Sequence, residues 1–577
     1  SLATTVTVAT ERGTLAASAT AAGDSERENL QNIFQDDTDI DPTIEIFRTM
    51  FQDAQEPLRS RRTEIAKLLI AAGAKPDIKG RGVPLLGASV GRQVEIVRLL
   101  LEAGADPNRR MNGGVTPLIC SVYMQAPEAQ FRLLLEKGAD PHLPTSTPQE
   151  PGNGEEPDSP DDMSTLEFAA SLGEVASFGV MLDSLDPGKL NDTQKTGLLG
   201  SALGNPELLK IVLAAGFDVN LANEEKRTAL HYAASMHGVE SVRMLLEAGA
   251  DVKARDQSGY MPIHHAAKKG STEIVEILLA KAPSQIESTI GGDTTPLILA
   301  CAEGGNADTV AFLIGKGANL EATFGPDKMT ALMYCAQWGR ADSAECLIKA
   351  GADIKVTSNN HSVLRTAVGC DSFHERMVTI EGATNHKPGT EEDYLRIARL
   401  LIEHGADVNQ VGDGNGKGMP PLISALRSGS VAMVTLLLKH GADANITNKN
   451  DYGRNPLWTP IEMGNIELFG LILDEIDDVD ARDDAKSTPL HFAASMNQPE
   501  MVKELLKRGA RINAQEKNGA TPLLMAVARS ARKAARTLLE AGADRTITDR
   551  VKATPMDRAE HLGDHEMINI LITVRKK

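Results

Sequence analysis

Aromatic residues are scarce in this 577-residue chain, since Phe, Trp and Tyr together make up 3% of it. A single hydrophobic core rarely grows beyond about 250–300 residues, so a chain of this length needs another way to bury its apolar surface. Ala, Leu and Gly are abundant instead, which favours short helices that approach one another closely. We therefore expect either several domains or a repeat array.

Cysteine is also rare, with five residues and no Cys-x-x-Cys pair. A sparse and odd-numbered set of cysteines in a long chain indicates reduced thiols and an intracellular setting. Long apolar runs are absent too, because none approaches the ~18 residues that a membrane-spanning helix needs. The sequence therefore predicts an intracellular protein without a membrane span.

The N-terminal stretch 1–23 is rich in Ser, Thr and Ala and poor in acidic residues. This composition fits a disordered tail, and it also fits the remnant of a segment that directs import into an organelle. We assign residues 1–41 to such an N-terminal tail. The predicted location is accordingly the cytoplasm, or an organelle if this tail is a processed targeting remnant.

Positive charge is in deficit, because the formal net charge at pH 7 is −19. This balance argues against general nucleic-acid binding, which depends on neutralising phosphates. The charge is uneven, however: residues 486–577 hold 17 Lys/Arg and 10 Asp/Glu, a net +7, which leaves −26 on the other residues. The basic C-terminal end therefore predicts a contact surface for an acidic partner.

The chain does contain a recurring two-helix repeat, which is clearest at Thr228–Lys253. Thr228 is suited to cap a helix, because its hydroxyl accepts a hydrogen bond from an otherwise unpaired backbone N–H. Apolar residues then recur at helical spacing through two segments separated by His237 and Gly238. Gly249 ends the second helix, since glycine tolerates positive φ. Such a repeat cannot bury its apolar faces alone and needs a copy on each side.

Two signatures mark these repeats along the chain. Thr-Pro-Leu opens them at 116–118, 295–297, 488–490 and 521–523, and Gly-Ala-Asp closes them, with the Gly positions 33 to 36 residues apart over most of the chain. On these residues the chain resembles the ankyrin-repeat family, whose consensus is TPLHxAA followed by LLxxGADxN at a period of about 33 residues. The resemblance covers about 14 copies from about residue 60 onward. It implies an all-α solenoid of helix-turn-helix repeats with β-turn or hairpin loops.

Two insertions interrupt the period. Residues 143–163 are Pro-rich and acidic, and we expect them to form a flexible loop. Residues 371–392 separate the two helices of one repeat, either as a tolerated surface loop or as a segment that folds onto a partner. The predicted repeats therefore occupy 42–142 with an atypical N-terminal cap, 164–370, and 393–577 with a C-terminal cap.

No catalytic constellation stands out in the sequence. GDGNGKG at 412–418 lacks residues that a phosphate-binding or calcium-binding loop requires, so a flexible loop between repeats is the better interpretation. His231, His264 and His491 occupy the His slot of TPLH, where the family uses the imidazole to bond neighbouring backbone. We therefore expect no enzyme activity, no cofactor and no metal.

Positions that the repeat pattern leaves open are the candidates for function. By resemblance to the family, the two residues after the Ala-Ala slot and the loop tips line an extended concave groove. Trp and Met there favour partner binding, because Trp is a frequent hot-spot residue and Met adapts to irregular surfaces. The alternative is that they cover neighbouring side chains or the inserted loop. The candidate partner-binding residues are Met236, Tyr260, Lys269, Trp338, Tyr452, Met463, Met496, Arg529, Arg532 and Lys533.

These features predict a non-enzymatic scaffold or regulatory subunit that binds one or more proteins in its concave groove. The basic cluster around Arg529 and Arg532 fits an acidic protein, a phosphate or RNA, or simply a solvated face. One alternative function is a fixed structural subunit of a large multiprotein assembly. Another is the regulatory part of an enzyme or channel complex. The repeats do not identify a partner, because one fold serves unrelated processes.

Overall fold

A computed structural model describes most of the chain from residue 57 to residue 575. The predicted tail at 1–41 lies outside the described residues, as do most of both insertions and the loop at 412–417. The described ranges are 57–77, 84–110, 115–144, 164–185, 188, 190–301, 306–358, 361–369, 388–411, 418–447 and 452–575.

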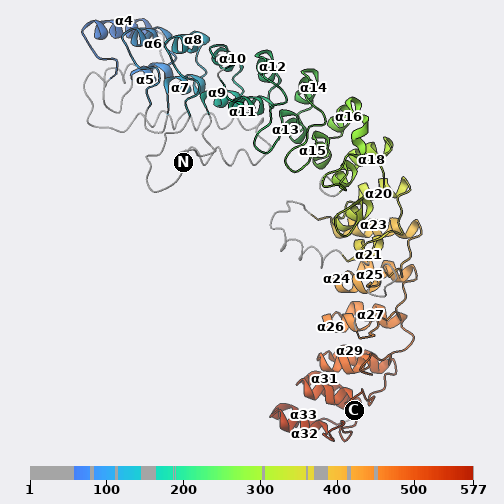
Figure 1. The fold of residues 1–577 in the computed structure, drawn as a ribbon. Coiled ribbons are helices and arrows are strands. Elements are labelled where there is room, and N and C mark those ends of the chain that lie inside the picture. The colour runs from blue at the N-terminus through green and yellow to red at the C-terminus, as the bar shows by residue number, and fades with distance from the viewer. Residues whose placement is uncertain are drawn as a thin grey trace. The chain divides into compact units, whose positions relative to one another are not determined.

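The described chain is a succession of short helix pairs, grouped in two compact units (Figure 1). The N-terminal unit comprises Ser1–His265 with Glu276–Ala282, and the C-terminal unit comprises Ala266–Val275 with Pro283–Lys577. Strands in the described ranges are limited to two hairpins, β1–β2 and β3–β4, each of two antiparallel strands. The predicted all-α solenoid of helix pairs with turn and hairpin loops is confirmed.

The helices of the N-terminal unit follow one another in pairs, and the last pair, α15 and α16, is divided between the two units. In chain order they are α4 (Pro57–Ala71), α5 (Pro84–Val90), α6 (Val94–Glu102), α7 (Pro117–Tyr123), α8 (Glu128–Glu136), α9 (Thr165–Ser171), α10 (Val175–Asp183), α11 (Asp192–Ala202), α12 (Pro206–Ala214), α13 (Ala229–Ser235), α14 (Val239–Glu247), α15 (Pro262–Lys269) and α16 (Thr272–Lys281).

The C-terminal unit continues the same alternation of first and second helices. Its elements are the 3₁₀ helix η2 (Pro283–Glu287), α17 (Pro296–Leu299), α18 (Ala307–Gly315), β1 (Thr323–Phe324), β2 (Met329–Thr330), α19 (Ala331–Trp338), α20 (Ala341–Lys349), β3 (Thr357–Ser358), β4 (His361–Ser362), α21 (Val363–Val368), α23 (Glu391–Glu403), α24 (Pro421–Ser428), α25 (Val431–Lys439), α26 (Trp458–Met463), α27 (Ile466–Glu475), α28 (Pro489–Ser495), α29 (Pro499–Lys507), α30 (Pro522–Ala528), α31 (Arg532–Glu540), α32 (Pro555–His561) and α33 (His565–Thr573).

Local sequence chemistry sets where these helices begin and end. The Thr of Thr-Pro-Leu is the N-cap, as at Thr116, whose Oγ1 accepts a hydrogen bond from the backbone N–H of Ile119 at 3.2 Å. The following Pro occupies a position where a backbone N–H would have no helical partner. At the other end Gly249 has φ of +93°, and the next N–H, that of Ala250, reaches back to the Leu245 carbonyl at 2.9 Å. This left-handed ending closes the second helix.

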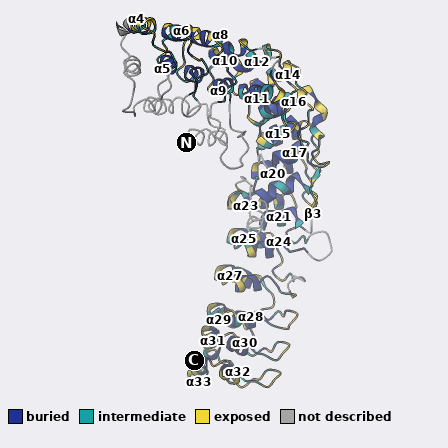
Figure 2. Cartoon of the chain, turned by 60° about the vertical axis from the view of Figure 1, so that its left-hand side comes forward, coloured by how far each residue is buried: buried dark blue, intermediate teal, exposed yellow. Residues whose placement is uncertain are grey.

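The core of each unit lies between the two rows of helices. In the C-terminal unit α28, α30 and α32 form one row, α29, α31 and α33 form another, and the loops project beyond the first row (Figure 2). Ala493 and Ala494, in the Ala-Ala slot of α28, are fully buried. Small side chains there allow neighbouring first helices to pack closely, so the Ala-rich composition follows from the stacking.

Side chains of one repeat satisfy the backbone of the next. Asn108 accepts a hydrogen bond from the Asp140 backbone N–H at 2.7 Å and donates to the Gly138 carbonyl at 2.8 Å. Asn220 accepts from the Asp251 N–H at 2.7 Å in the same way. Equivalent bonds join Asn409 to Asp443 and Asn513 to Asp544. The loop that closes each of these repeats is therefore fixed by its predecessor.

The histidines of the TPLH slot provide a second link between repeats. Nδ1 of His491 accepts the Thr488 backbone N–H at 3.1 Å, and Nε2 lies 3.1 Å from the carbonyl oxygen of Ala520 in the following repeat. His231 makes the same pair of contacts with Thr228 and Tyr260. Because Nδ1 accepts, Nε2 carries the proton and the ring is neutral. The structural role expected for these two histidines is confirmed.

Replacing His491 by Ala should lower the free energy of unfolding by about 2–4 kcal/mol, because a buried N–H and a part-buried carbonyl each lose their partner. Chemical denaturation of the purified chain measures this change. Lys503→Ala, at an exposed position paired with Glu500, is the control and should change stability by less than about 0.5 kcal/mol. Equal effects of the two variants would contradict the proposed role of the imidazole.

Burial lowers the pKa of His491 below its ordinary value of 6.5. The unfolded chain therefore takes up a proton near pH 6.5 while the folded ring stays neutral, so stability falls as pH drops below that value. We expect the free energy of unfolding to decline less steeply between pH 7 and pH 5 in His491→Ala than in the wild type. Parallel pH profiles for the two proteins would show that this histidine does not contribute.

Candidate interaction surface

Four successive repeats of the C-terminal unit expose the side chain at the end of their first helix. Met463, Met496 and Leu562 are 47%, 40% and 49% exposed, and Arg529 is exposed at the corresponding position of α30. We call these four residues the apolar row, after its three large apolar members. Exposed large apolar side chains that recur in register are uncommon on a surface that contacts only water.

Local geometry explains why these positions are open. Met496 is the C-cap residue of α28, directly after the buried face that carries Ala493 and Ala494. The N–H of Met496 completes the helix by bonding the Phe492 carbonyl at 2.9 Å, which leaves its side chain outside the stack. The repeat therefore needs no apolar side chain at this position, and the Met is a departure from the pattern.

Sequence reasoning identified Met463, Met496 and Arg529 but missed Leu562. The signal was available, because Leu562 follows Thr554 by the same interval as Met496 follows Thr488. Two further candidates also occupy first-helix ends. Met236 in the N-terminal unit is 59% exposed, and Lys269 at the end of α15 is exposed in the C-terminal unit.

The exposure predicted for Trp338 is wrong, because its side chain is only 8% exposed. The chain returning from the second insertion lies against the end of α19 at this point. The N–H of Gly389 donates to the Trp338 carbonyl at 3.0 Å, and the Tyr394 hydroxyl donates to the Gln337 carbonyl at 3.2 Å. A slot that is open in other repeats is therefore covered here by the segment that leads into α23.

The two candidate loop tyrosines differ in their surroundings. Tyr452 is 67% exposed and has a positive φ of 55°, so its side chain is presented at a loop tip. Tyr260 is half-buried, its carbonyl is bound by His231, and its ring centroid lies 5.1 Å from that of His265. Tyr452 is consequently the stronger candidate for contact with a partner.

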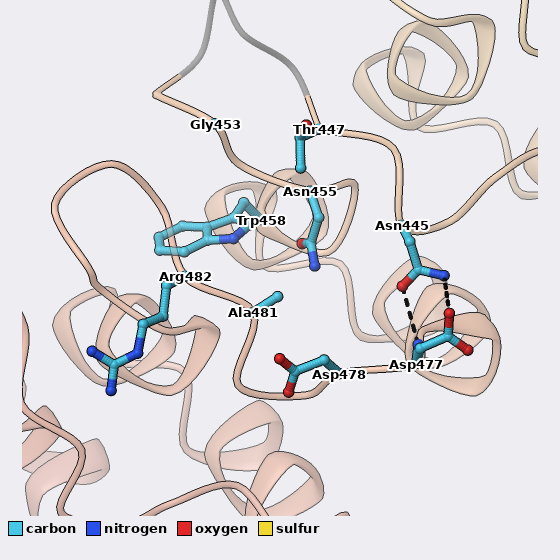
Figure 3. Close-up of a pocket in the computed structure, with 9 residues that line it drawn as sticks. All are labelled: Asn445, Thr447, Gly453, Asn455, Trp458, Asp477, Asp478, Ala481 and Arg482. Carbon is cyan, nitrogen blue, oxygen red and sulfur yellow. Dashed lines mark hydrogen bonds between the residues drawn. The ribbon is translucent and has the colours of Figure 1, made fainter.

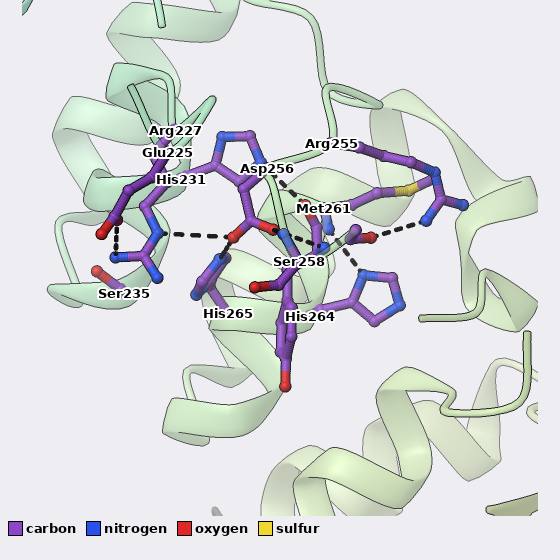
Figure 4. A network of polar contacts seen from close by, with 12 residues as sticks. Glu225, Arg227, His231, Ser235, Arg255, Asp256, Ser258, Met261, His264 and His265 are labelled. Carbon is purple, nitrogen blue, oxygen red and sulfur yellow. Dashed lines mark hydrogen bonds and ion pairs between the residues drawn. The ribbon is translucent and has the colours of Figure 1, made fainter. Parts of the chain in front are cut away.

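Tyr260 belongs to a polar network around the buried carboxylate of Asp256 (Figure 4). Oδ1 accepts the N–H of Tyr260 at 2.9 Å, and Oδ2 lies 3.0 Å from His265 Nε2 and 3.6 Å from Arg227 Nε. Burial by itself raises the pKa of Asp256, but the bonds from His265 and Tyr260 outweigh it and hold the pKa below its ordinary value. The network keeps a loop folded and brings no nucleophile to the surface.

A second cluster holds the Tyr452 loop in place. The guanidinium carbon of Arg454 lies 4.8 Å from the ring centroid of Trp458, 5.0 Å from that of Phe492 and 5.4 Å from that of Tyr452. Trp458 occupies the His slot of its repeat, and it is buried. A cation between aromatic rings thus replaces the imidazole link at this degraded repeat.

A small cavity of about 250 Å³ opens beside this cluster (Figure 3). Asn445 and Asp477 close one side with two hydrogen bonds of 2.9 and 3.0 Å. Asn455 is buried, and its amide nitrogen points into the cavity. The cavity can hydrogen-bond a small polar group, and its residues form no catalytic pair. The lining residues are Asn445, Thr447, Gly453, Asn455, Trp458, Asp477, Asp478, Ala481 and Arg482.

The residues of the basic cluster predicted near the C-terminal end have different surroundings in the structure. Arg532 bonds the buried carboxylate of Asp564 at 2.9 Å and the exposed carboxylate of Glu566 at 2.6 Å, so it joins α31 to α33. Arg532 is 45% exposed, but its guanidinium is engaged in these contacts between helices, and its role in partner binding stays a prediction. Arg529 and Lys533 are exposed, but Arg529 ends a first helix while Lys533 lies on the second helix α31.

Other reactive groups in the described ranges are structural. Cys301 and Cys335 are fully buried, and their mutual hydrogen bond together with burial raises the pKa of the Cys301 thiol. In the part of the chain that the structure describes, no cluster of His, Cys, Asp and Glu side chains is placed to hold a metal ion. No helix in those ranges is both long and apolar enough to cross a bilayer.

Comparison with known proteins identifies the repeats. The family profile described as "Ankyrin repeats (3 copies)" matches residues 57–145, 198–290, 263–358, 390–483, 471–549 and 490–576, which is more than half of the chain. The chain belongs to the ankyrin-repeat family. Ankyrin repeats are in general a protein-interaction fold and carry no enzymatic activity of their own.

Curated ankyrin-repeat relatives match over limited segments. Human transient receptor potential cation channel subfamily A member 1 is 30% identical over 161 residues, which is 26% of this chain and 12% of the channel. The nuclear factor NF-kappa-B p105 subunit of Gallus gallus is 30% identical over 115 residues, 20% of this chain and 12% of that protein. Palmitoyltransferase AKR1 of Lachancea kluyveri is 36% identical over 118 residues, 20% of this chain and 15% of the enzyme. The chain thus aligns with less than a sixth of each of these relatives.

Trp338→Ala should lower the free energy of unfolding by about 3–5 kcal/mol, because it removes a large side chain from a packed site. Chemical denaturation followed by circular dichroism measures the change. Phe324→Ala, at an aromatic side chain that is 36% exposed, is the control and should cost less than about 1 kcal/mol. A Trp338→Ala protein as stable as the wild type would contradict the burial of this residue.

Proposed function

We propose that this chain is a non-enzymatic ankyrin-repeat scaffold, and that its C-terminal unit binds a protein segment along the apolar row. The observation that carries the proposal is the recurrence of exposed Met463, Met496 and Leu562 at one position of neighbouring repeats. A partner that covered these side chains would gain about 1.5–3 kcal/mol for each one that it buried completely. Met also adapts to irregular partner surfaces because it is unbranched and flexible.

The backbone behind the row supports this proposal. First helices α26, α28, α30 and α32 pack in succession, and each stacked pair is linked through its loops. The row is consequently in place before a partner arrives, which reduces the entropy that binding must overcome. Arg529 adds a charged hydrogen-bond donor of the residue type that is enriched at interface hot spots.

Several aspects of the function stay predictions. A fixed subunit of a large assembly and a regulatory part of an enzyme or channel complex would use the same surface. The channel and the palmitoyltransferase among the relatives align only over a short segment, so their activities do not transfer to this chain. We also propose that the protein is intracellular, as its sparse cysteines predict.

A random peptide library displayed on phage provides a probe that needs no known partner. Peptides selected on the wild-type chain should bind the double variant Met463→Ala, Met496→Ala at least about tenfold more weakly, because truncating two hot-spot side chains costs more than about 1 kcal/mol each. Fluorescence anisotropy with synthetic copies of the selected peptides measures the affinities.

Ile572→Ala is the matched control, since Ile572 is a 65% exposed apolar residue of α33 and lies on the other row of helices. The selected peptides should bind this variant as they bind the wild type. If the double variant keeps full affinity, or if no peptide is enriched, the apolar row is not the binding surface.

A further inference from the structure

We infer that the C-terminal unit recognises an acidic protein segment in extended conformation, held by a line of cations at its loop tips. This inference rests on the proposed function and specifies the chemistry of the partner. The cations are Lys486, Lys517, Arg550 and Lys552, which we call the cationic strip. All four are exposed, and the structure gives none of them an acidic partner among the described residues.

The loops that carry the strip are joined edge to edge. The backbone N–H of Asp484 donates to the Tyr452 carbonyl at 2.8 Å. That of Lys517 donates to the Ala485 carbonyl at 2.9 Å, and that of Arg550 donates to the Asn518 carbonyl at 2.8 Å. Four loop tips in successive repeats therefore form one continuous ladder, and the positions of the cations along it are set by backbone bonds.

Acidic residues in these loops are turned inward, where they hold the turns. Asp483 accepts the N–H groups of Ala485 and Ser487 at 2.9 and 2.8 Å. Glu516 accepts in the same way within its own loop, and Asp549 also binds Arg558 at 2.6 Å. Asp484 is the one of these acidic residues that is exposed. Its carboxylate lies against Gly453, because a Cβ added to that glycine would be 2.9 Å from Asp484 Oδ1. The outward charge of the tips is thus predominantly positive.

Two of the cations occupy a backbone conformation that side chains seldom adopt. Lys486 and Lys552 have φ of 58° and 63°, at the loop position where Gly453 and Gly519 have 72° and 78°. Glycine is the residue that takes this conformation without steric cost. Lys226 and Lys328 have the same conformation at the same position of other repeats, so the backbone accepts lysine here and directs its charge to the loop tip, where we assign it to the partner.

The spacing of the tips indicates the form of the partner. The first helices behind the tips pack one against the next, which sets an interaxial distance of about 8–10 Å, and the linked tips share this spacing. An extended chain rises about 3.3 Å per residue, and three residues therefore match one repeat. A helix is disfavoured, because it needs a continuous apolar groove, and the exposed large apolar side chains of the described tips, Tyr452 and Val551, lie on the first and the last tip with Ala485, Asn518 and Gly519 between them. The matching segment carries an acidic residue at every third position.

A protein segment fits this surface better than a nucleic acid. The rest of the chain carries a large excess of acid, which repels a long polyanion but tolerates a short segment with a few carboxylates. The apolar row in the same four repeats adds side chains that suit a polypeptide. Contacts between exposed charges are screened by salt, so binding should weaken as ionic strength rises.

Two synthetic peptides of identical composition test the inference with the full chain. One has Glu at every third position, and the other has the same Glu residues side by side. Fluorescence anisotropy at low salt should give at least about threefold tighter binding of the spaced peptide. The double variant Lys517→Glu, Lys552→Glu should weaken that binding at least about tenfold.

Lys439→Glu, Arg536→Glu is the matched control, because it changes the net charge by the same amount at exposed positions of the second helices α25 and α31. It should reduce affinity less than about twofold, and circular dichroism checks that both variants keep the wild-type helix content. If the two peptides bind equally, the partner does not need an acidic residue at every third position. If both double variants lose the same affinity, the cationic strip is not the binding surface. Tighter, strip-dependent binding of polyuridylate would assign the surface to nucleic acid instead.

These outcomes separate the present inference from the proposed function. If phage-selected peptides depend on Met463 and Met496 while neither Glu spacing nor the loop-tip lysines matter, the apolar row binds a partner and the cationic strip does not. If the spaced peptide binds through Lys517 and Lys552 while the methionine variants bind as the wild type does, the cationic strip binds a partner and the apolar row does not.

Discussion

The structure depends on one recurring hydrogen bond between repeats. An Asn side chain of one repeat accepts the backbone N–H of the Asp that follows Gly-Ala at the end of the next repeat. Asn108 does this for Asp140, Asn220 for Asp251 and Asn513 for Asp544. Each contact reaches only the neighbouring repeat, so the array is held by a series of local links. The same links repeat the backbone geometry, and they therefore place corresponding side chains of successive repeats at corresponding positions.

Because of this periodicity, unusual side chains at the same position of successive repeats line up and form a continuous surface. A single exposed Met is ordinary, whereas Met463, Met496 and Leu562 at one position of stacked repeats make a continuous feature. Lysines in place of glycine at Lys486 and Lys552 extend along the loop tips in the same way. The cationic strip lies on three loop tips of the four repeats that carry the apolar row, and the regular frame between them is what would let one partner meet both.

Two predicted binding residues differ from this pattern, because another part of the chain covers or pairs with their side chains. Trp338 holds the same slot as Met496, yet the segment at Gly389 and Tyr394 covers it. Arg532 belongs to a basic run in the sequence, yet its guanidinium joins two helices through Asp564 and Glu566. The insertion thus buries Trp338, whereas the neighbouring repeat pairs Arg532 and leaves it 45% exposed.

The sequence by itself determined the family, the two-helix repeat and the ends of many helices, because caps such as Thr228 and Gly249 act on backbone groups within a few residues. It also determined the structural role of His231 and His491, since their slot is part of the repeat. Only the tertiary structure decided which open slots face solvent, as Trp338 and Leu562 demonstrate. Exposure and pairing depend on atoms that are distant in sequence, and no local pattern of residues contains them.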